Sequence, residues 1–122
     1  MTPFEIASDR GVSQALRRRY GEDAMVKGII GYKVGNYKDI EGRLMKLRSH
    51  AMQYPGFVSA ENLVSDVDST VVIMISTWQS IDNWRAWLKS RITQDLIRPD
   101  NELSKDKART TVYRVMPASD WR

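Results

Sequence analysis

The chain has 122 residues, the length of one ordinary domain, and its 42% hydrophobic and 28% charged residues are typical of a globular protein. No apolar run approaches the roughly eighteen residues that span a membrane, and the N-terminus lacks the apolar core of a signal peptide, so we expect a cytoplasmic protein. The absence of cysteine excludes disulfides and thiol chemistry, and a formal charge of +4 spread along the chain indicates a solvated surface rather than a nucleic-acid-binding face.

The first half of the chain predicts a strand followed by a helix. Residues 1–24 form an N-terminal extension in which residues 12–19 have the pattern of a short basic helix. Residues 25–34 alternate as a core strand, in which Gly28 and Gly31 permit close approach of the backbone. One face of this strand is apolar at Val26, Ile30, Tyr32 and Val34. Apolar residues then recur at helical spacing over residues 37–53.

The second half predicts two strands, a helix and a last strand. Pro55 and Gly56 end the first helix, and residues 57–65 form a strand with Asn62 on the same face as Ala60. Residues 66–69 make the turn into a third strand, residues 70–78. Ser80 is a typical N-cap for a helix whose apolar stripe consists of Ile81, Trp84, Leu88, Ile92 and Leu96. After a loop over residues 99–107, alternation returns in residues 110–116.

The order β-α-β-β-α-β predicts an α+β, ferredoxin-like domain over residues 25–116, with an antiparallel sheet and both helices on one face. The third strand is apolar on both sides, since Val71, Ile73 and Ile75 alternate with Val72 and Met74. The face without helices therefore needs an apolar cover, and a second copy of the chain is a better cover than the basic N-terminal extension. We expect a homodimer in which two sheets form an α/β barrel, and a C-terminal tail over residues 117–122.

Three of the four tryptophans lie within ten residues, and their helical positions differ. Trp84 lies on the apolar stripe and is expected in the core, as is Trp78 at the end of its strand. Trp87 lies about 120° from the centre of the predicted stripe, so it is the tryptophan that packing explains least, and we expect it to face a pocket. His50, the one histidine, lies on a helix flank, as either a capping charge or a general base.

Most familiar catalytic motifs are missing from the sequence. There is no P-loop, no GxGxxG before a helix, no HExxH and no GxSxG. A single histidine cannot build a multi-histidine metal site. The third strand offers VVIMIS, whereas an RNA-recognition sheet carries aromatic and basic residues there. We therefore expect no metal, no nucleic-acid partner and no membrane partner.

A wider pattern resembles the antibiotic biosynthesis monooxygenase (ABM) family over roughly residues 25–116. Its members have a helix ending in PGF, then a strand, a hairpin, and a tryptophan-rich segment that begins W-x-S. The matching residues here are Pro55, Gly56, Phe57, Trp78, Ser80, Trp84, Trp87 and Ser90. The resemblance implies a dimeric α/β barrel and either oxidation of quinols or polycyclic aromatics by oxygen, without metal or flavin, or breakdown of haem. The resemblance to the haem-degrading branch fails at two positions. Ile97 stands near the position of that branch's ligand histidine, and Gly28 stands near the position of its strand asparagine, so haem degradation is disfavoured.

The cofactor-free branch needs removal of a phenolic proton and donors that stabilise the resulting anion. We expect Tyr32, Trp78 and Trp87 to frame a flat aromatic ligand, with Asn62 donating to its oxygen and His50 assisting proton transfer. The alternative is a non-catalytic dimer of the same fold that binds a small molecule or a partner. Pocket polarity separates the two: a cavity shared by Asn62, Tyr32 and Trp87 favours catalysis, whereas filling by Met74 and leucines favours the binding module.

Overall fold

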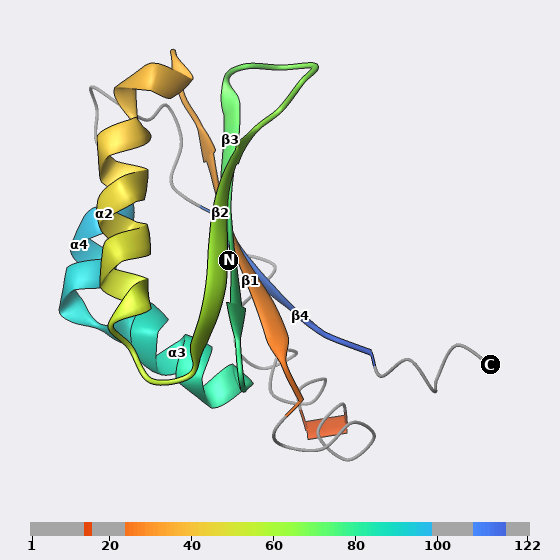
Figure 1. Cartoon of the computed structure of the whole chain (residues 1–122). Helices are drawn as coiled ribbons and strands as arrows, with labels where there is room; N and C mark the ends of the chain where they lie inside the picture. The colour runs from red at the N-terminus through yellow and green to blue at the C-terminus, as the bar shows by residue number, and fades with distance from the viewer. Residues whose placement is uncertain (1–13, 16–23, 99–108, 117–122) are drawn as a thin grey trace.

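The computed structural model describes residues 14–15, 24–98 and 109–116. Its elements alternate between one antiparallel sheet and a layer of helices (Figure 1). In chain order they are β1 (Val26–Lys33), the 3-10 turn η1 (Tyr37–Asp39), α2 (Glu41–Met52), β2 (Phe57–Val64), β3 (Val71–Trp78), α3 (Ile81–Lys89), α4 (Arg91–Ile97) and β4 (Arg109–Arg114). Within the described ranges, no helix is long and apolar enough to cross a membrane.

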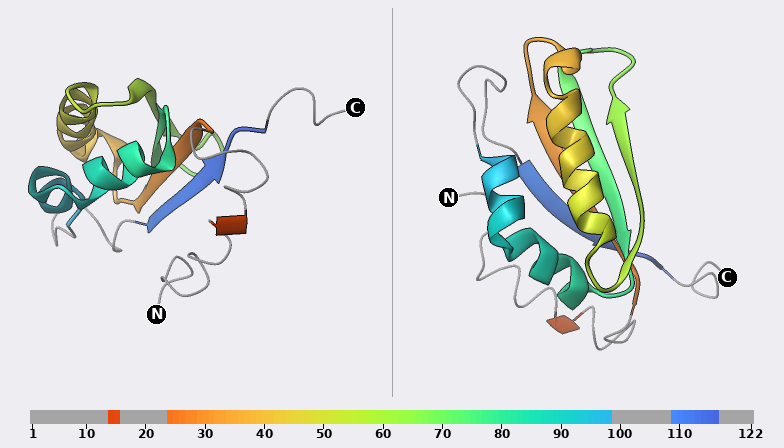
Figure 2. Two further views of the ribbon diagram at one scale, coloured as in Figure 1. Left: turned by 90° about the horizontal axis from the view of Figure 1, so that it is seen from below. Right: turned by 60° about the vertical axis from the view of Figure 1, so that its left-hand side comes forward.

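The sheet has the strand order β2-β3-β1-β4, and every pair of neighbours is antiparallel. Figure 2 shows α2, α3 and α4 together on one side of this sheet. The two βαβ units therefore interleave as a ferredoxin-like fold does, with β1 and β3 at the centre. The predicted α+β, ferredoxin-like class is confirmed.

The core lies between the sheet and the helices. Alternation in β1 and β3 directs one set of side chains to the helices, because successive residues of a strand point to opposite faces. The fully or nearly fully buried residues of this layer include Val26, Ile30, Tyr32, Val34, Leu44, Leu47, Met74 and Trp78. The predicted inner face of the first strand is thus the core face, and both central strands contribute to it.

The turn after α2 is shaped by Gly56, whose φ of 84° is in the left-handed region that side chains disfavour. A Cβ on Gly56 would also collide with the Asn83 side chain at the start of α3. The Gln79 amide donates to the Gly56 carbonyl at 2.8 Å, which ties this turn to the end of β3. The Pro-Gly pair therefore follows the end of α2 and places the turn against the start of α3.

The prediction of one continuous helix from Ser80 to Leu96 is wrong. Ser90 is extended, with φ of −61° and ψ of 148°, and it separates α3 from α4. Its hydroxyl accepts from the Thr93 amide at 3.3 Å, as the Ser80 hydroxyl does from Asn83, so each serine caps a helix N-terminus. The break also turns Ile92, a predicted stripe residue, out to solvent, while Thr93 is fully buried.

The face of the sheet away from the helices carries Ile29, Ile73 and Ile75, which are half-buried. These residues and Val71 point away from the core, as the doubly apolar pattern of β3 predicts. Of the predicted N-terminal helix, only residues 14–15 are described, and both are helical. The predicted loop over residues 99–107 and the tail over residues 117–122 lie outside the described residues.

Candidate functional site

An aromatic cluster lies at the end of the core where β3 runs into α3. Phe57 meets Trp78 edge-on, with ring centroids 5.5 Å apart, and Trp78 lies against Trp87 at 5.4 Å with the rings tilted by 30°. The Trp78 indole N–H donates to the Ser76 hydroxyl at 2.9 Å. Trp78 and Trp87 are both 0% exposed. The structure therefore brings together these two predicted ligand-framing residues.

The burial of Trp87 corrects the expectation that it lies on the flank of the buried face. The predicted stripe included Ile92 and Leu96, which moved its calculated centre away from Trp87. Because α3 ends at Lys89, its true buried arc is Ile81, Trp84 and Trp87. At about 100° per residue, Trp87 is only about 60° from Trp84, the centre of this arc. Trp87 is therefore a core residue that packs against Trp78.

Trp84 lies in the core, as its position on the stripe predicted. Its indole packs directly on Gly28, where any Cβ would lie against Nε1 and within 2.8 Å of Cε2. Gly28 is beside Ser76 in the register of the sheet, and Ser76 is beside Ala60. A row of small residues across three strands thus gives room for the indoles above it.

Three buried donors in this layer have no hydrogen-bond partner among the described residues. They are the Tyr32 hydroxyl and the indole N–H groups of Trp84 and Trp87. A buried donor without an acceptor costs about 1–3 kcal/mol, so several in one layer are unusual for a core of purely structural purpose. The sequence showed the tryptophans but not their unpaired N–H groups.

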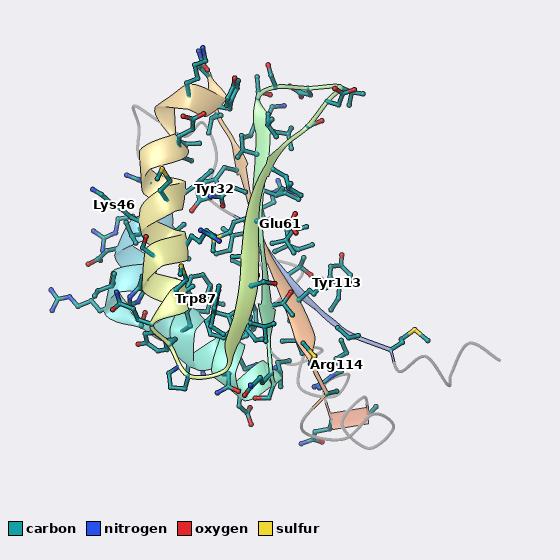
Figure 3. All side chains as sticks on the ribbon, viewed as in Figure 1. Tyr32, Lys46, Glu61, Trp87, Tyr113 and Arg114 are labelled. Atoms are coloured by element: carbon teal, nitrogen blue, oxygen red, sulfur yellow. The ribbon has the colours of Figure 1, made fainter. Side chains whose placement is uncertain are left out.

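Tyr32 belongs to the far end of the same layer. It pairs with Val72, which is six residues from Trp78 along β3, so the two aromatic residues are separated by about 20 Å of strand. Burial raises the pKa of the Tyr32 phenol well above its usual range, against a smaller opposing effect of the Arg43 charge. The phenol therefore stays protonated and is a donor. Figure 3 shows Tyr32 and Trp87 both on the helix side of the sheet.

The middle of the layer between Tyr32 and the tryptophans holds apolar side chains. Met74 and Leu47 are fully buried, and Ile30 is nearly so. Ile30 and Met74 pair in the row of the sheet between those of Tyr32 and Gly28. The structure therefore does not bring Tyr32 into contact range of the Trp78 and Trp87 pair across this row.

Asn62 lies on β2 and pairs with the buried Met74 of β3. Its position in the register is therefore on the helix-facing side, the side of Ala60, as predicted. Its side chain is nevertheless exposed, because β2 is the edge strand and only Ala60 among its residues is buried. Arg48 reaches from α2 to donate to the Ala60 carbonyl at 3.3 Å. Asn62 thus lies at the rim of the helix-facing side rather than within the core.

His50 joins α2 to the junction of α3 and α4. Its Nε2 is 3.1 Å from the Ser90 hydroxyl, and its ring meets Tyr54 edge-on at 5.1 Å. Ser90 also contacts Thr93, with 2.9 Å between the hydroxyl oxygens, and its amide donates to the Trp87 carbonyl at 3.1 Å. Burial lowers the pKa of His50, which favours the neutral imidazole. A neutral imidazole is a proton acceptor. Ser90 links this one to Trp87, since its hydroxyl contacts His50 and its amide donates to the Trp87 carbonyl.

The fold and this aromatic layer define a small ferredoxin-like domain with a tryptophan-rich interior. The profile of the antibiotic biosynthesis monooxygenase family matches residues 30–98, more than half of the chain, and the chain belongs to this family. No curated protein sequence is significantly similar to it.

Solved structures of the same fold cover most of the chain. SnoaB from Streptomyces nogalater, a cofactor-independent oxygenase, superposes with a TM-score of 0.65 at 16% identity, covering 78% of this chain and 96% of its own. Protein SO0527 from Shewanella oneidensis gives 0.66 at 14% identity, with coverage of 76% and 92%. PA3566 from Pseudomonas aeruginosa gives 0.65 at 13% identity, with coverage of 79% and 98%. At these identities the likeness establishes the fold.

Proposed function

We propose that the chain is a cofactor-independent monooxygenase that oxidises a quinol or polycyclic aromatic between the sheet and the helices. Membership of the family supports the reaction type. The observation that carries the proposal is that the indole N–H groups of Trp84 and Trp87 are buried without acceptors; the Tyr32 hydroxyl is a third such donor, at the far end of the same layer. Flat aromatic walls with unpaired donors suit a planar ligand that presents carbonyl or phenolate oxygens.

These donors match the charge that develops when a phenol loses its proton. An indole N–H can only donate, and the Tyr32 phenol stays protonated because burial raises its pKa. Donors held in an apolar layer stabilise an anion more strongly than donors in water do. The layer therefore favours the phenolate form of a substrate, which is the form that reacts with oxygen.

We assign proton acceptance to His50 and ligand positioning to Asn62. The neutral His50 imidazole accepts the phenolic proton, while Asn62 donates to a ligand oxygen at the rim of β2. The step applies to a polycyclic phenol whose keto tautomer carries a ring CH2: one oxygen atom replaces the two hydrogens of that carbon as a carbonyl, and those hydrogens leave with the second oxygen atom as water. All four electrons that reduce O2 come from that carbon, so the balance needs no external reductant.

A second candidate function is a dimeric binding module without catalysis. The observation that favours it is the complete burial of Met74 and Leu47 in the middle of the layer. By the criterion of pocket polarity set out above, this filling favours the binding module, and a substrate enters the layer only if Met74 and Leu47 move. Ligand binding without oxygen consumption is the outcome that separates this module from the enzyme.

The test is oxygen uptake by the pure, metal-free protein with a panel of hydroquinones and hydroxylated polycyclic aromatics. We expect uptake with at least one substrate and a loss of tenfold or more in Trp87→Phe and Asn62→Ala. Tyr32→Phe removes an unpaired buried hydroxyl, so it should lower activity while leaving the free protein as stable or about 1 kcal/mol more stable. Tyr37→Phe, in the 3-10 turn η1, is the matched control, because the Tyr37 hydroxyl is not among the buried donors without an acceptor. No uptake with any substrate refutes the monooxygenase.

We also infer that the protein works as a homodimer in which the helix-free faces of two sheets pack together. Ile29, Ile73 and Ile75 lie on this face, together with Leu63 and Tyr113, which are 40% and 59% exposed. Apolar surface of this extent on one side of a sheet is typical of an interface. Light scattering at micromolar concentration should give about twice the 14.1 kDa subunit mass, and a mass of one subunit would contradict the dimer.

A further inference from the structure

The helix-facing side of the sheet consists of rows that each take one residue from neighbouring strands. The row of Gly28 and Ser76 lies under the Trp84 indole, whose N–H is a buried donor without an acceptor within the described parts of the chain. The row of Tyr32 and Val72 carries a second such donor, the phenol hydroxyl. Successive rows on one face are about 7 Å apart, so about 13 Å of strand separates the backbones under these two donors.

Met74 occupies the single row between the two donors. It pairs with Ile30 on β1 and with Asn62 on β2, and it is 0% exposed. Asn62 is exposed at the rim of this row, so Met74 is the first buried side chain that a ligand entering there along the row meets. A ligand that accepts from both the Trp84 N–H and the Tyr32 hydroxyl therefore has to lie where the Met74 side chain lies.

Met74 is also the residue of this region that moves most easily. Ile30 and Val72 are β-branched, which restricts their χ1 angles. A methionine side chain is unbranched, has three rotatable bonds and adapts to irregular space. The neighbouring row offers only the short side chains of Ser76 and Ala60 beside it on β3 and β2. Met74 can therefore change its conformation without a shift of the strands.

We propose that Met74 is the specificity-determining residue of the layer, and that its side chain moves aside to admit a planar aromatic with an oxygen at each end. One oxygen accepts from the Trp84 N–H and the other from the Tyr32 hydroxyl, so that the rings lie over the Met74 row. This inference rests on the proposed function, whose ligand lies between the sheet and the helices. It explains why unpaired buried donors lie on both sides of a filled apolar row.

The arrangement selects ligands in two ways. An aromatic that lacks an oxygen at one end leaves one donor buried without an acceptor, so it gains less from entering the layer. A displaced methionine can still contact the rings of the ligand, because a thioether interacts favourably with aromatic groups. A stiffer residue at this position would lose that adaptability.

Methyl NMR of the full chain, with isotope-labelled methionine, tests the movement directly. The chain has six methionines, and the Met74 resonance is the one that disappears in Met74→Leu. The probe is anthraflavic acid, a planar dihydroxyanthraquinone with a phenol oxygen on each outer ring. We expect the Met74 resonance to shift on binding, whereas those of Met45 and Met52, which are 66% and 54% exposed on α2, should not.

Affinities for this probe, measured by quenching of tryptophan fluorescence, test the role of position 74. Met74→Ala removes the side chain that has to move, so the dissociation constant should fall by about threefold or more. Met74→Leu keeps the volume but has a stiffer, branched side chain, and binding should weaken by about threefold or more. Val34→Ala, at a fully buried position two rows from Met74, controls for loosening of the core and should leave the constant unchanged. Circular dichroism checks that each variant is folded.

Tyr32→Phe tests whether the ligand reaches both donors. It removes the hydroxyl at one end only, so binding of anthraflavic acid should weaken about tenfold. Unsubstituted anthraquinone is the matched probe, because it has the same three rings but carries both oxygens on the central one. Its affinity should be the same in Tyr32→Phe and in the wild type.

Four results would overturn the proposal. They are a Met74 resonance that does not respond to saturating probe, a Met74→Ala variant that binds no more tightly than Val34→Ala, equal effects of Tyr32→Phe on the two probes, and no binding by either the wild type or Met74→Ala. None of these readouts consumes oxygen. Binding as expected without oxygen uptake would refute the proposed oxygenase and leave this ligand geometry standing, so the two failures are distinguishable.

Discussion

Gly28→Ala is the sharpest test of how the tryptophan layer is built. Trp84 is 6% exposed and its indole lies on the Gly28 backbone, so that an added Cβ would fall within 2.6 Å of Cδ1 and 2.8 Å of Cε2. The buried ring has little room to retreat, since α3 holds it above the sheet. Overpacking of this kind costs about 1–3 kcal/mol.

The same strand offers a matched control. A Cβ on Gly31 meets only the Ile73 side chain at 3.7 Å and the Arg109 carbonyl at 3.9 Å, which are ordinary contacts. Replacing glycine with alanine at such a site reduces the entropy of the unfolded chain, so Gly31→Ala should be neutral or stabilising by roughly 0.5 kcal/mol.

Urea unfolding followed by tryptophan fluorescence and circular dichroism, at one fixed protein concentration, measures both variants. We expect Gly28→Ala to lower the free energy of unfolding by about 1–3 kcal/mol relative to Gly31→Ala. Equal stability of the two variants would refute the close packing of Trp84 on β1.

Three further predictions concern the turns and the histidine. Gly56→Ala should lose about 1–3 kcal/mol of stability, because φ of 84° and the Asn83 side chain both oppose a Cβ; an unchanged urea midpoint would contradict this. Ser80→Ala removes the N-cap of α3 and should cost about 1 kcal/mol, whereas Ser80→Thr should retain most of it. Burial lowers the pKa of His50 below that in the unfolded chain, so its contribution to stability is complete above about pH 6.5 and falls as the pH drops towards the folded-state pKa. His50→Gln should flatten the pH dependence of unfolding between pH 7 and 5, and an identical profile in this variant would exclude His50 as its source.

The motif that resembles the ABM family now has a structural explanation at most of its positions. Gly56 forms the turn, Phe57 packs edge-on against Trp78, and Ser80 and Ser90 cap successive helices. These roles explain why the pattern identifies a fold more strongly than a reaction. The proposed chemistry depends instead on buried donors without acceptors, above all the N–H groups of Trp84 and Trp87.

The sequence by itself determined the order of strands and helices. Apolar alternation located β1 and β3 to within a residue or two at each end, and Pro55 with Gly56 marked the end of α2. These features are local, because side-chain period and backbone restriction act over a few residues. The doubly apolar β3 also predicted that the second face of the sheet needs a partner.

Only the tertiary structure decided which aromatic residues meet. The break at Ser90 was hidden because apolar spacing continued through it, although a serine three residues before Thr93 repeats the capping pattern of Ser80 and Asn83. That break turned Ile92 outward and centred the buried arc of α3 on Trp84, which buried Trp87. The contact of Trp84 with Gly28, the separation of Tyr32 from Trp78, and the exposure of Asn62 depend on how helices pack over particular rows of the sheet. Such packing brings together residues that are far apart in the chain, so the periodicity of a short segment does not predict it.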